Sequence, residues 1–426
     1  MNKVKALVPK LRFPEFRDAD GWEESGLADI TSAIFDGTHQ TPTYTAKGIP
    51  FYSVENLVSG NANKFISKED HELATKKNKP EQGDLLITRI GKIGYSQVVS
   101  WPHEFSIYVT LAVIKRGPKF NSHFLHYSIQ SALYQKEILS KSLLNAVPCK
   151  INMDSLRLTR IRLAGPAEQK KIAECLTSLD EVIAAQRQKL DALKTHKKGL
   201  MQQLFPREGE TLPRLRFPEF QNAGEWTEGL LISLSSEALS NGVFNDPKKV
   251  GSGYKLINVS DMYIETTIDE SRLSLLELSL SEFEANRVIH GDIFFTRSSL
   301  VKSGIAVSNI YLGSSNDVTF DGHLIRFRPD TSKVVALFAH YLFKTAPIRA
   351  HLIARGKSAT MTTIGQADVA SVVLFYPPKA EQQRIADCLT SLDDLIAAQT
   401  QKLDALKTHK KGLMQQLFPS PAEVEP

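Results

Sequence analysis

Cysteine is scarce in this chain, and no stretch of it is apolar for long. Only Cys149, Cys175 and Cys388 occur, with neither a CxxC pair nor a histidine at ligand spacing, so neither disulfides nor a zinc site is expected. No run of about eighteen apolar residues is present, and residues 1–10 lack the apolar core of a signal peptide. We therefore expect a cytoplasmic protein that binds no metal.

A strong excess of one charge is also missing. The net charge is +5, from 52 Lys and Arg against 47 Asp and Glu, so a basic surface for nucleic acid would have to be local. With 23% charged and 42% hydrophobic residues, the composition is that of a globular protein. The 426 residues exceed one ordinary core, which indicates two domains with connectors. Composition alone leaves nucleic-acid binding undecided.

An internal repeat dominates the sequence. The segment 167–206, AEQKKIAECLTSLDEVIAAQRQKLDALKTHKKGLMQQLFP, returns almost unchanged at 380–419. A shorter repeat precedes each half, and a tryptophan follows it: VPKLRFPEF at 8–16 with Trp22, and LPRLRFPEF at 212–220 with Trp226.

Two segments of largely unrelated sequence lie between the repeats, at roughly residues 25–165 and 229–376. If both copies of a duplication needed the same ligand, they would have no reason to diverge only in the middle. The repeated segments are therefore predicted to set the geometry of the protein, and the variable segments to determine its binding specificity.

Each long repeat carries the heptad pattern of a coiled-coil seam, and proline occurs only at its flanks. A run of about 37 residues gives a helix on the order of 55 Å long, which exceeds one turn of DNA, roughly 34 Å. The predicted seam residues are Leu176, Leu179, Ile183, Gln186, Leu190, Leu193, Lys197, Leu200 and Leu204, with Leu389, Leu392, Ile396, Gln399, Leu403, Leu406, Lys410, Leu413 and Leu417 in the second copy.

Two such seams in one chain most simply pack on each other. A two-fold relation perpendicular to the helices makes them antiparallel and places the variable domains at opposite ends, which suits the dyads of duplex DNA. The polar seam residues are predicted to fix the register. The basic cluster Lys194, His196, Lys197 and Lys198, repeated at 407–411, could follow a phosphate backbone, although a solvated helix end that suits the helix dipole is favoured.

Both variable segments mix short β-rich runs with helical stretches, which predicts an α+β domain for each. They share one feature, because GDLLITR at 83–89 matches GDIFFTR at 291–297 in type. Arg89 and Arg297 thus stand where a strand runs into a loop, and each loop also holds a lysine. Arginine makes the bidentate guanine contact of the major groove, although such an arginine is often in an ordinary surface ion pair.

Loops early and late in each segment supply further candidates. The early loops, 35–48 and 240–253, are rich in Thr, Gln, Asn and Lys, which can read base edges or simply connect strands. The late loops include 150–152 and 355–360, where a phosphate contact competes with a plain exposed loop. The predicted DNA-binding residues are Thr38, His39, Gln40, Thr88, Arg89, Lys92, Lys150 and Asn152 in the first segment, and Lys248, Lys249, Thr296, Arg297, Ser298, Lys302 and Lys357 in the second.

Taken together, the LRFPEF openings with their tryptophans, the GD-x-x-x-TR strands, the P-x-AEQ-x-x-IA-x-CL helix starts and the HKKGLMQQLFP helix ends resemble the specificity subunits of type I restriction-modification enzymes. The resemblance covers nearly the whole chain. It implies two target recognition domains at 25–165 and 229–376, each reading half of a bipartite site. The other expected segments are 1–24, the spacer helices 166–206 and 377–419, the linker 207–228 and a tail 420–426.

The implied fold is α+β, with two α/β target recognition domains related by pseudo-two-fold symmetry and separated by two long antiparallel coiled-coil helices. Implied partners are double-stranded DNA, two methyltransferase subunits that use S-adenosylmethionine, and restriction subunits that use ATP and magnesium; no cofactor is expected in this chain. Consistent with this division, we find no FxGxG, NPPY or NPPF, GxxxxGK(S/T) or PD…ExK motif.

Two other hypotheses remain. A coiled-coil scaffold that pairs two protein-binding domains would show no salt-dependent affinity for DNA. An enzyme would need a catalytic set, yet His39, His103 and His323 have no convincing nucleophile or metal partner in the sequence.

Overall fold

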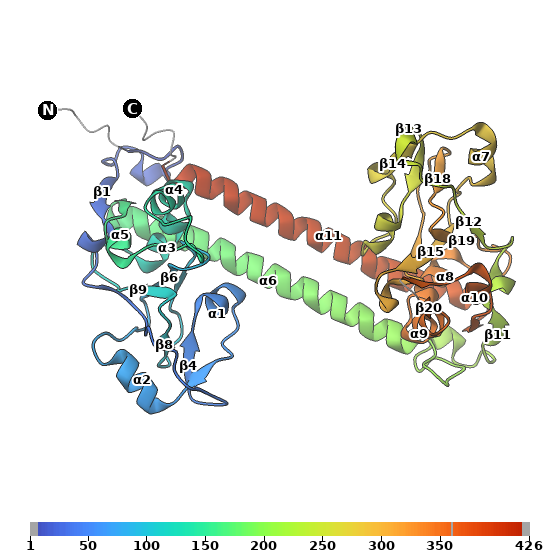
Figure 1. Cartoon of the computed structure of the whole chain (residues 1–426), viewed down its shortest axis with the longest axis horizontal. Coiled ribbons are helices and arrows are strands. Elements are labelled where there is room, and N and C mark those ends of the chain that lie inside the picture. Colours follow the sequence, from blue (N-terminus) through green and yellow to red (C-terminus); the bar gives the residue numbers. More distant parts are fainter. Residues whose placement is uncertain (1–6, 359–360, 420–426) are drawn as a thin grey trace. The chain divides into compact units, whose positions relative to one another are not determined.

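The computed structural model describes residues 7–358 and 361–419, so the predicted tail 420–426 and Thr360 of the second late loop lie outside the described residues. The chain divides into two compact units. The first comprises the chain up to Arg187 and again from Lys402 on, and the second comprises Gln188–Gln401. Each unit contains an α/β body and a part of both long helices (Figure 1). None of the described helices is long and apolar enough to cross a membrane.

The first unit begins with the single-turn helices η1 (Pro14–Phe16) and η2 (Leu27–Asp29). Its strands are β1 (Glu23–Gly26), β2 (Ile34–Asp36), β3 (Tyr44–Thr45), β4 (Ile49–Tyr52), β5 (Phe65–Ile66), β6 (Leu85–Thr88), β7 (Ser96–Val98), β8 (Ser106–Ile107), β9 (Leu111–Ile114) and β10 (Arg160–Leu163). Its helices are α1 (Val54–Ser59), α2 (Lys68–Thr75), α3 (Ser122–Gln130), α4 (Ala132–Ser140), α5 (Met153–Arg157) and the first part of α6 (Pro166–Leu204).

A four-stranded antiparallel sheet, ordered β2-β9-β6-β7, forms the centre of this unit. All four residues of β6 are buried. Leu85 and Ile87 face a core shared with α3, α4 and α5, whereas Leu86 faces a second core under the sheet β3-β5-β4-β8. Burial on both faces explains why this strand reads as a continuous apolar run rather than an alternating one.

The strands of the second unit are β11 (Thr227–Leu230), β12 (Ser240–Asn241), β13 (Val250–Ile257), β14 (Ser274–Leu276), β15 (Ile293–Thr296), β16 (Ser298–Ser299), β17 (Ser308–Ile310), β18 (Val318–Phe320), β19 (Leu324–Phe327), β20 (Lys357–Ser358), β21 (Thr362–Thr363) and β22 (Val373–Tyr376). Its helices are α7 (Leu280–Ala285), α8 (Ala336–Phe343), α9 (Ala346–Ala354), α10 (Gln366–Ala370), the first part of α11 (Lys379–Leu417) and the single turns η3 (Pro218–Phe220), η4 (Leu231–Leu234), η5 (Pro247–Lys249), η6 (Val259–Tyr263), η7 (Glu270–Arg272) and η8 (Lys302–Gly304).

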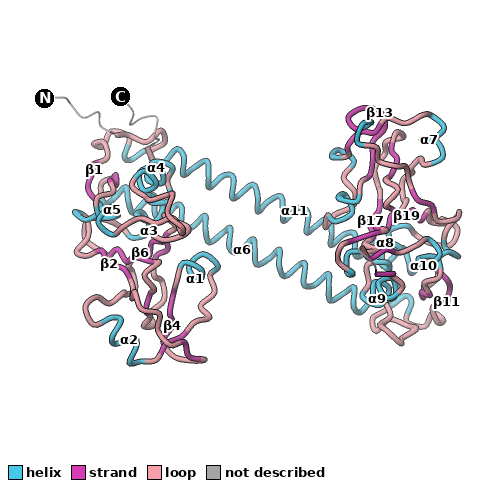
Figure 2. Tube along the Cα trace, in the orientation of Figure 1, coloured by secondary structure: helices cyan, strands magenta, loops and turns pink. Residues whose placement is uncertain are grey.

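This unit repeats the topology of the first despite its different sequence. Its central sheet is ordered β12-β19-β15-β17, with β15 in the place of β6, and Ile293 and Phe295 face the helices while Phe294 faces the other side. The β13–β18 pair is parallel, like β4–β8, and β11–β22 repeats β1–β10. The strands predicted around the two GD-x-x-x-TR motifs are thus confirmed, and the loops appear as the pink segments of Figure 2.

The LRFPEF repeats hold the ends of the long helices. In the first unit the guanidinium of Arg12 donates to both carboxylate oxygens of Glu168, at 2.9 and 2.5 Å, and to the backbone oxygens of Ala19 and Asp20. Because the pair is buried, its hydrogen bonds replace those that water would have made. Trp22 packs on Phe124 and Phe418, which joins the other long helix to the same core.

The second unit repeats these contacts. Arg216 donates to Glu381 at 2.8 and 2.5 Å and to the backbone oxygens of Ala223 and Gly224. Trp226 packs against Phe205 and Phe338. The shared frame of the two halves is therefore a shared set of contacts, as the duplication predicted.

Within each unit the two long helices run antiparallel. In the first, residues 172–176 of α6 pack against residues 413–418, and Asp180 of α6 accepts a hydrogen bond from Lys410 Nζ of α11 at 2.5 Å. The hydroxyl of Tyr127 donates to the same carboxylate at 2.7 Å, while the Lys410 ammonium lies 5.1 Å from the tyrosine ring centroid. The prediction of two long antiparallel helices is confirmed.

An equivalent three-residue set recurs in the second unit, where Lys197 Nζ lies 2.5 Å from Asp393 and Tyr341 donates to that aspartate at 2.7 Å. Each polar seam lysine thus meets one carboxylate of the opposite helix, which ties the two helices to one register. In the two predicted basic clusters, Lys194 also pairs with Glu265 and Lys407 with Asp404. Together with Lys197 and Lys410, half of the residues in these clusters are thus paired with carboxylates.

Candidate nucleic-acid interface

The two ends of the GD-x-x-x-TR strand are fixed by buried polar groups. In the first unit Asp84 is fully buried and accepts from Lys115 Nζ at 2.8 Å and from the backbone nitrogens of Glu81 and Arg116. At the other end, the Thr88 hydroxyl accepts from the backbone nitrogen of Tyr95 at 2.9 Å. The aspartate therefore anchors the start of the strand, and the threonine closes the loop that follows it.

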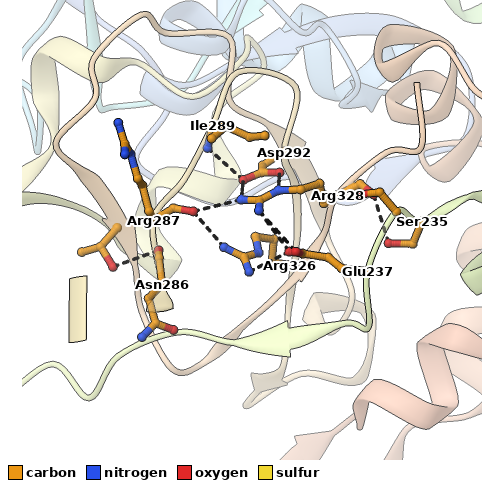
Figure 3. Close-up of polar contacts among 10 residues, drawn as sticks. Ser235, Glu237, Asn286, Arg287, Ile289, Asp292, Arg326 and Arg328 are labelled. Atoms are coloured by element: carbon orange, nitrogen blue, oxygen red, sulfur yellow. Dashed lines mark hydrogen bonds and ion pairs between the residues drawn. The ribbon is translucent and has the colours of Figure 1, made fainter. Parts of the chain in front are cut away.

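The second unit uses the same positions with a larger cluster of charge (Figure 3). Asp292, also fully buried, accepts from Nε and Nη2 of Arg328, both at 2.8 Å, and from the backbone nitrogen of Ile289. Glu237 pairs with both Arg326 and Arg328. Thr296, like Thr88, accepts from a backbone nitrogen, that of Val307, at 2.9 Å.

The two arginines that end these strands differ sharply in their surroundings. Arg89 is only 7% exposed, and its Nη1 donates to Asp36 Oδ2 at 3.1 Å and to the backbone oxygen of Val109 at 2.8 Å. Burial is the main cause that lowers the pKa of Arg89, and Asp36 opposes it. Placed in this way, Arg89 orients the loop around it, and its contact with DNA stays a prediction.

Arg297 is exposed, and no side chain in the described ranges pairs with its guanidinium. The reason lies on β2 and β12, the edge strands that pair with β9 and β19. Asp36 stands opposite Ala112, and Asn241 occupies the same register position opposite Ile325, so the second unit has a neutral amide where the first has a carboxylate. Arg297 consequently presents five unpaired donors at the surface, as a base or phosphate contact requires.

The early loops start in the same way in both units. A Cβ on Gly37 would lie 2.0 Å from the backbone oxygen of Ile107, and one on Gly242 would lie 1.9 Å from that of Phe320, so only glycine fits. Thr38 then forms a parallel bridge with Tyr108. His39 and Gln40 are exposed, and His39 Nε2 lies 3.0 Å from Asp36 Oδ2, the atom that also holds Arg89.

The first unit brings its predicted residues together. The backbone nitrogen of Ile151 donates to the backbone oxygen of Arg89 at 2.9 Å, and Ile90 forms a bridge with Lys150. Lys150 and Asn152 are exposed beside the loop that carries Lys92, whose ammonium lies 5.1 Å from the Tyr95 ring centroid. Asp36 connects the early loop to the same place through Arg89.

The second unit brings together only some of its predicted residues. Ser298 pairs with Thr363 in the small sheet β16-β21-β20, which also contains Lys357. Lys302 begins the single turn η8 that follows β16. Lys248 and Lys249 instead precede β13 beside β14, since Glu277 donates its backbone nitrogen to the backbone oxygen of Lys249. Figure 1 shows β14 and β20 in different parts of this unit.

Sequence reasoning passed over the apolar side chains exposed next to these cations. Leu300 and Val301 follow Arg297 in the second unit, and Leu143, Leu144 and Val147 precede Lys150 in the first. A signal was available, because apolar residues in a loop rich in Ser, Gly and Lys have no strand or helix to bury them. Among the residues that the structure describes, no group of His, Cys, Asp or Glu could hold a metal ion.

Comparison with known proteins agrees with this architecture. The model of a family described as the type I restriction modification DNA specificity domain matches twice, at residues 19–195 and 244–408. The putative type I restriction enzyme MjaX specificity subunit of Methanocaldococcus jannaschii is 22% identical over 95% of this chain and 95% of its own length. The type I restriction enzyme EcoKI specificity subunit of Escherichia coli is 23% identical over 86% and 81%.

Solved structures agree on the fold. A type I restriction-modification S subunit from M. genitalium superposes with a TM-score of 0.58 at 13% identity, covering 97% of this chain and 100% of that chain. A chain from a structural study of complex assembly in the type I system gives a TM-score of 0.55 at 16% identity, with coverages of 97% and 100%. With the family match over most of its length, this chain belongs to the type I restriction-modification DNA specificity family and carries the specificity domain twice.

Proposed function

We propose that this chain is the non-catalytic subunit of a type I restriction-modification complex, in which each α/β body reads one half of a bipartite DNA site. The proposal rests on the contrast between the repeated segments, whose contacts are the same in both halves, and the variable segments, whose surface residues differ. The contacts of Arg12, Asp180 and Lys410 recur at Arg216, Asp393 and Lys197, whereas the residues around Arg89 and Arg297 differ in charge and exposure.

The long helices offer equal docking sites for two copies of one partner. Val182 on α6 and Leu395 on α11 occupy the same position in the repeat, and both are exposed on a helix although they are apolar. Because the same apolar position is exposed on both helices, one partner could bind twice through the same surface. We infer that methyltransferase subunits dock there, and that they and the restriction subunits bring S-adenosylmethionine, ATP and magnesium to a complex that acts in the cytoplasm.

Docking is tested by replacing Val182 or Leu395 with Asp in the full chain and measuring how many methyltransferase subunits copurify with it. Each change should remove one of the two, because burying an unpaired carboxylate in an apolar contact is unfavourable. Gln188→Asp, at an exposed polar position of α6, is the matched control. Retention of both subunits by V182D and L395D would refute the docking site and leave the DNA-reading role untouched.

The DNA-reading role is tested by mapping methylated adenines in host genomes with the gene intact and deleted. A split motif with a fixed gap that is methylated only in the intact strain is expected. Exchanging residues 25–165 for the corresponding segment of a relative should change one half of that motif and leave the other half. If a complex with active methyltransferase methylates no such motif, and the purified complex shows no salt-dependent DNA affinity, the scaffold hypothesis replaces this one.

A further inference from the structure

The loop after β15 is longer than its counterpart after β6. In both units a strand-end threonine accepts from the backbone nitrogen that closes the loop, so the loops span 297–306 in the second unit and 89–94 in the first. The short loop turns Ile93 toward the core of its unit. The long loop buries Ile305 in the same way, but it also exposes Leu300 by 82% and Val301 by 62%.

The base of the long loop is held firmly, while the side chains of Leu300 and Val301 at its tip are exposed. Arg349, on α9, donates through Nη2 to the backbone oxygen of Ser303 at 2.9 Å and through Nη1 to that of Ile305 at 2.8 Å. The hydroxyls of Thr296 and Tyr263 both donate to the backbone oxygen of Gly304. A tip braced in this way projects its apolar side chains at little further cost in conformational entropy on binding.

Charge identifies what the tip would contact. Arg297 and Lys302 flank it and are exposed, and Lys357 lies exposed in the sheet that begins with Ser298. Neither the loop 297–306 nor the segment 355–363 contains an acidic residue. Apolar side chains between cations suit a DNA groove, where cations neutralise phosphates and apolar groups contact thymine methyls or wedge between base steps.

We propose that Leu300 and Val301 enter a groove of the DNA half-site read by the second unit and contact its bases, while Arg297 and Lys302 lie against the flanking phosphates. This inference rests on the proposed function and deepens it, because it assigns sequence discrimination in one half-site to two apolar side chains.

The test uses the full chain with its bound subunits and two DNA duplexes. One carries the motif identified from adenine methylation, and the other has only the half-site of the second unit scrambled. The L300A/V301A variant should bind the intact motif about tenfold more weakly and the scrambled duplex equally well, because lost base contacts cost discrimination. R297A/K302A should weaken binding to both duplexes and reduce the salt dependence, as lost phosphate contacts do.

Leu280→Ala is the matched control, since Leu280 is 66% exposed in the same unit but lies beside Glu282 and Glu284. It should leave both affinities unchanged. An L300A/V301A complex that discriminates the duplexes as well as the unsubstituted one overturns the inference, and so does one that merely loses bound subunits, which would mark the tip as a protein contact. If the unsubstituted complex itself cannot discriminate the duplexes, the proposed function fails.

Discussion

Asp36 and Asn241 occupy one register position in the two central sheets, and Asp36 pairs with the arginine that follows β6, whereas Asn241 carries no charge to pair with the arginine that follows β15. Asp36 pairs with Arg89 and also contacts His39. A single carboxylate-to-amide difference thus gives two similar frameworks different surface chemistry.

Replacing Asp36 with Asn should release Arg89 and lower the free energy of unfolding of the first unit. Because Arg89 is buried, losing its charged partner should cost about 1–3 kcal/mol. Chemical denaturation of the full chain measures this. Asp154→Asn, which breaks the exposed pair with Arg157, should change stability by less than about 0.5 kcal/mol. Equal effects of the two substitutions would count against the anchoring role of Asp36.

The buried cluster of Figure 3 offers a comparison between two carboxylates that bind the same arginine. Asp292 is fully buried, whereas the Glu237 side chain is 39% exposed, and both contact Arg328. Asp292→Asn should therefore destabilise the second unit by about 3–5 kcal/mol, as loss of a buried charge partner does. Glu237→Gln should cost less, about 1–2 kcal/mol, because Glu237 is partly exposed although it also pairs with the buried Arg326. Thermal unfolding that ranks the two the other way would contradict this assignment.

The lysine clamps between the long helices predict matched effects in the two halves. Lys410→Met and Lys197→Met should each destabilise by about 1 kcal/mol, because each leaves a partly exposed carboxylate, that of Asp180 or Asp393, without its cation. Lys407→Met, which breaks only an exposed pair within one helix, is the control and should be nearly neutral. A clamp substitution as mild as the control would show that apolar seam residues alone set the register.

Acid should weaken the fold through two histidines at equivalent positions in α3 and α8, the half-buried His126 and the buried His340. Burial, with a smaller effect of Lys410, lowers the pKa of His126 to about 4, and burial with Lys344 and Lys197 lowers that of His340 well below 6.5. Below pH 6.5 these two histidines bind more protons in the unfolded chain than in the folded chain. The free energy of unfolding should therefore fall as the pH drops from about 6.5 toward 4.

Replacing His340 with Leu should flatten this acid loss, and measurement at pH 8 separates any effect of packing from that of titration. A pH profile that keeps its full slope in both His340→Leu and His126→Leu would exclude these residues as its source.

The frame was readable from the sequence because it is periodic and duplicated. Heptad spacing located both long helices, and the repeated GD and TR dipeptides marked β6 and β15. Surface exposure at the strand ends was not readable, because Arg89 and Arg297 end the same GD-x-x-x-TR pattern. Arg89 meets the carboxylate of Asp36 on another strand, whereas Asn241 stands at the equivalent position in the second unit. Tertiary register, which no local pattern encodes, made that difference. The sequence also did not show that Lys248 and Lys249 lie beside β14, away from the other predicted DNA-binding residues of the second unit, because that placement too is set by tertiary structure.

The division of the chain bears on the order in which the ribosome can complete its two units. Leu417 and Phe418 belong to the same apolar core as Trp22, although almost four hundred residues separate them from it in sequence. The second unit is one uninterrupted segment, Gln188–Gln401. During synthesis, therefore, the second unit is fully translated before the first unit is. The first unit cannot complete its core until the C-terminal part of α11 has been synthesised. This is the reverse of the usual order, in which the N-terminal domain folds first.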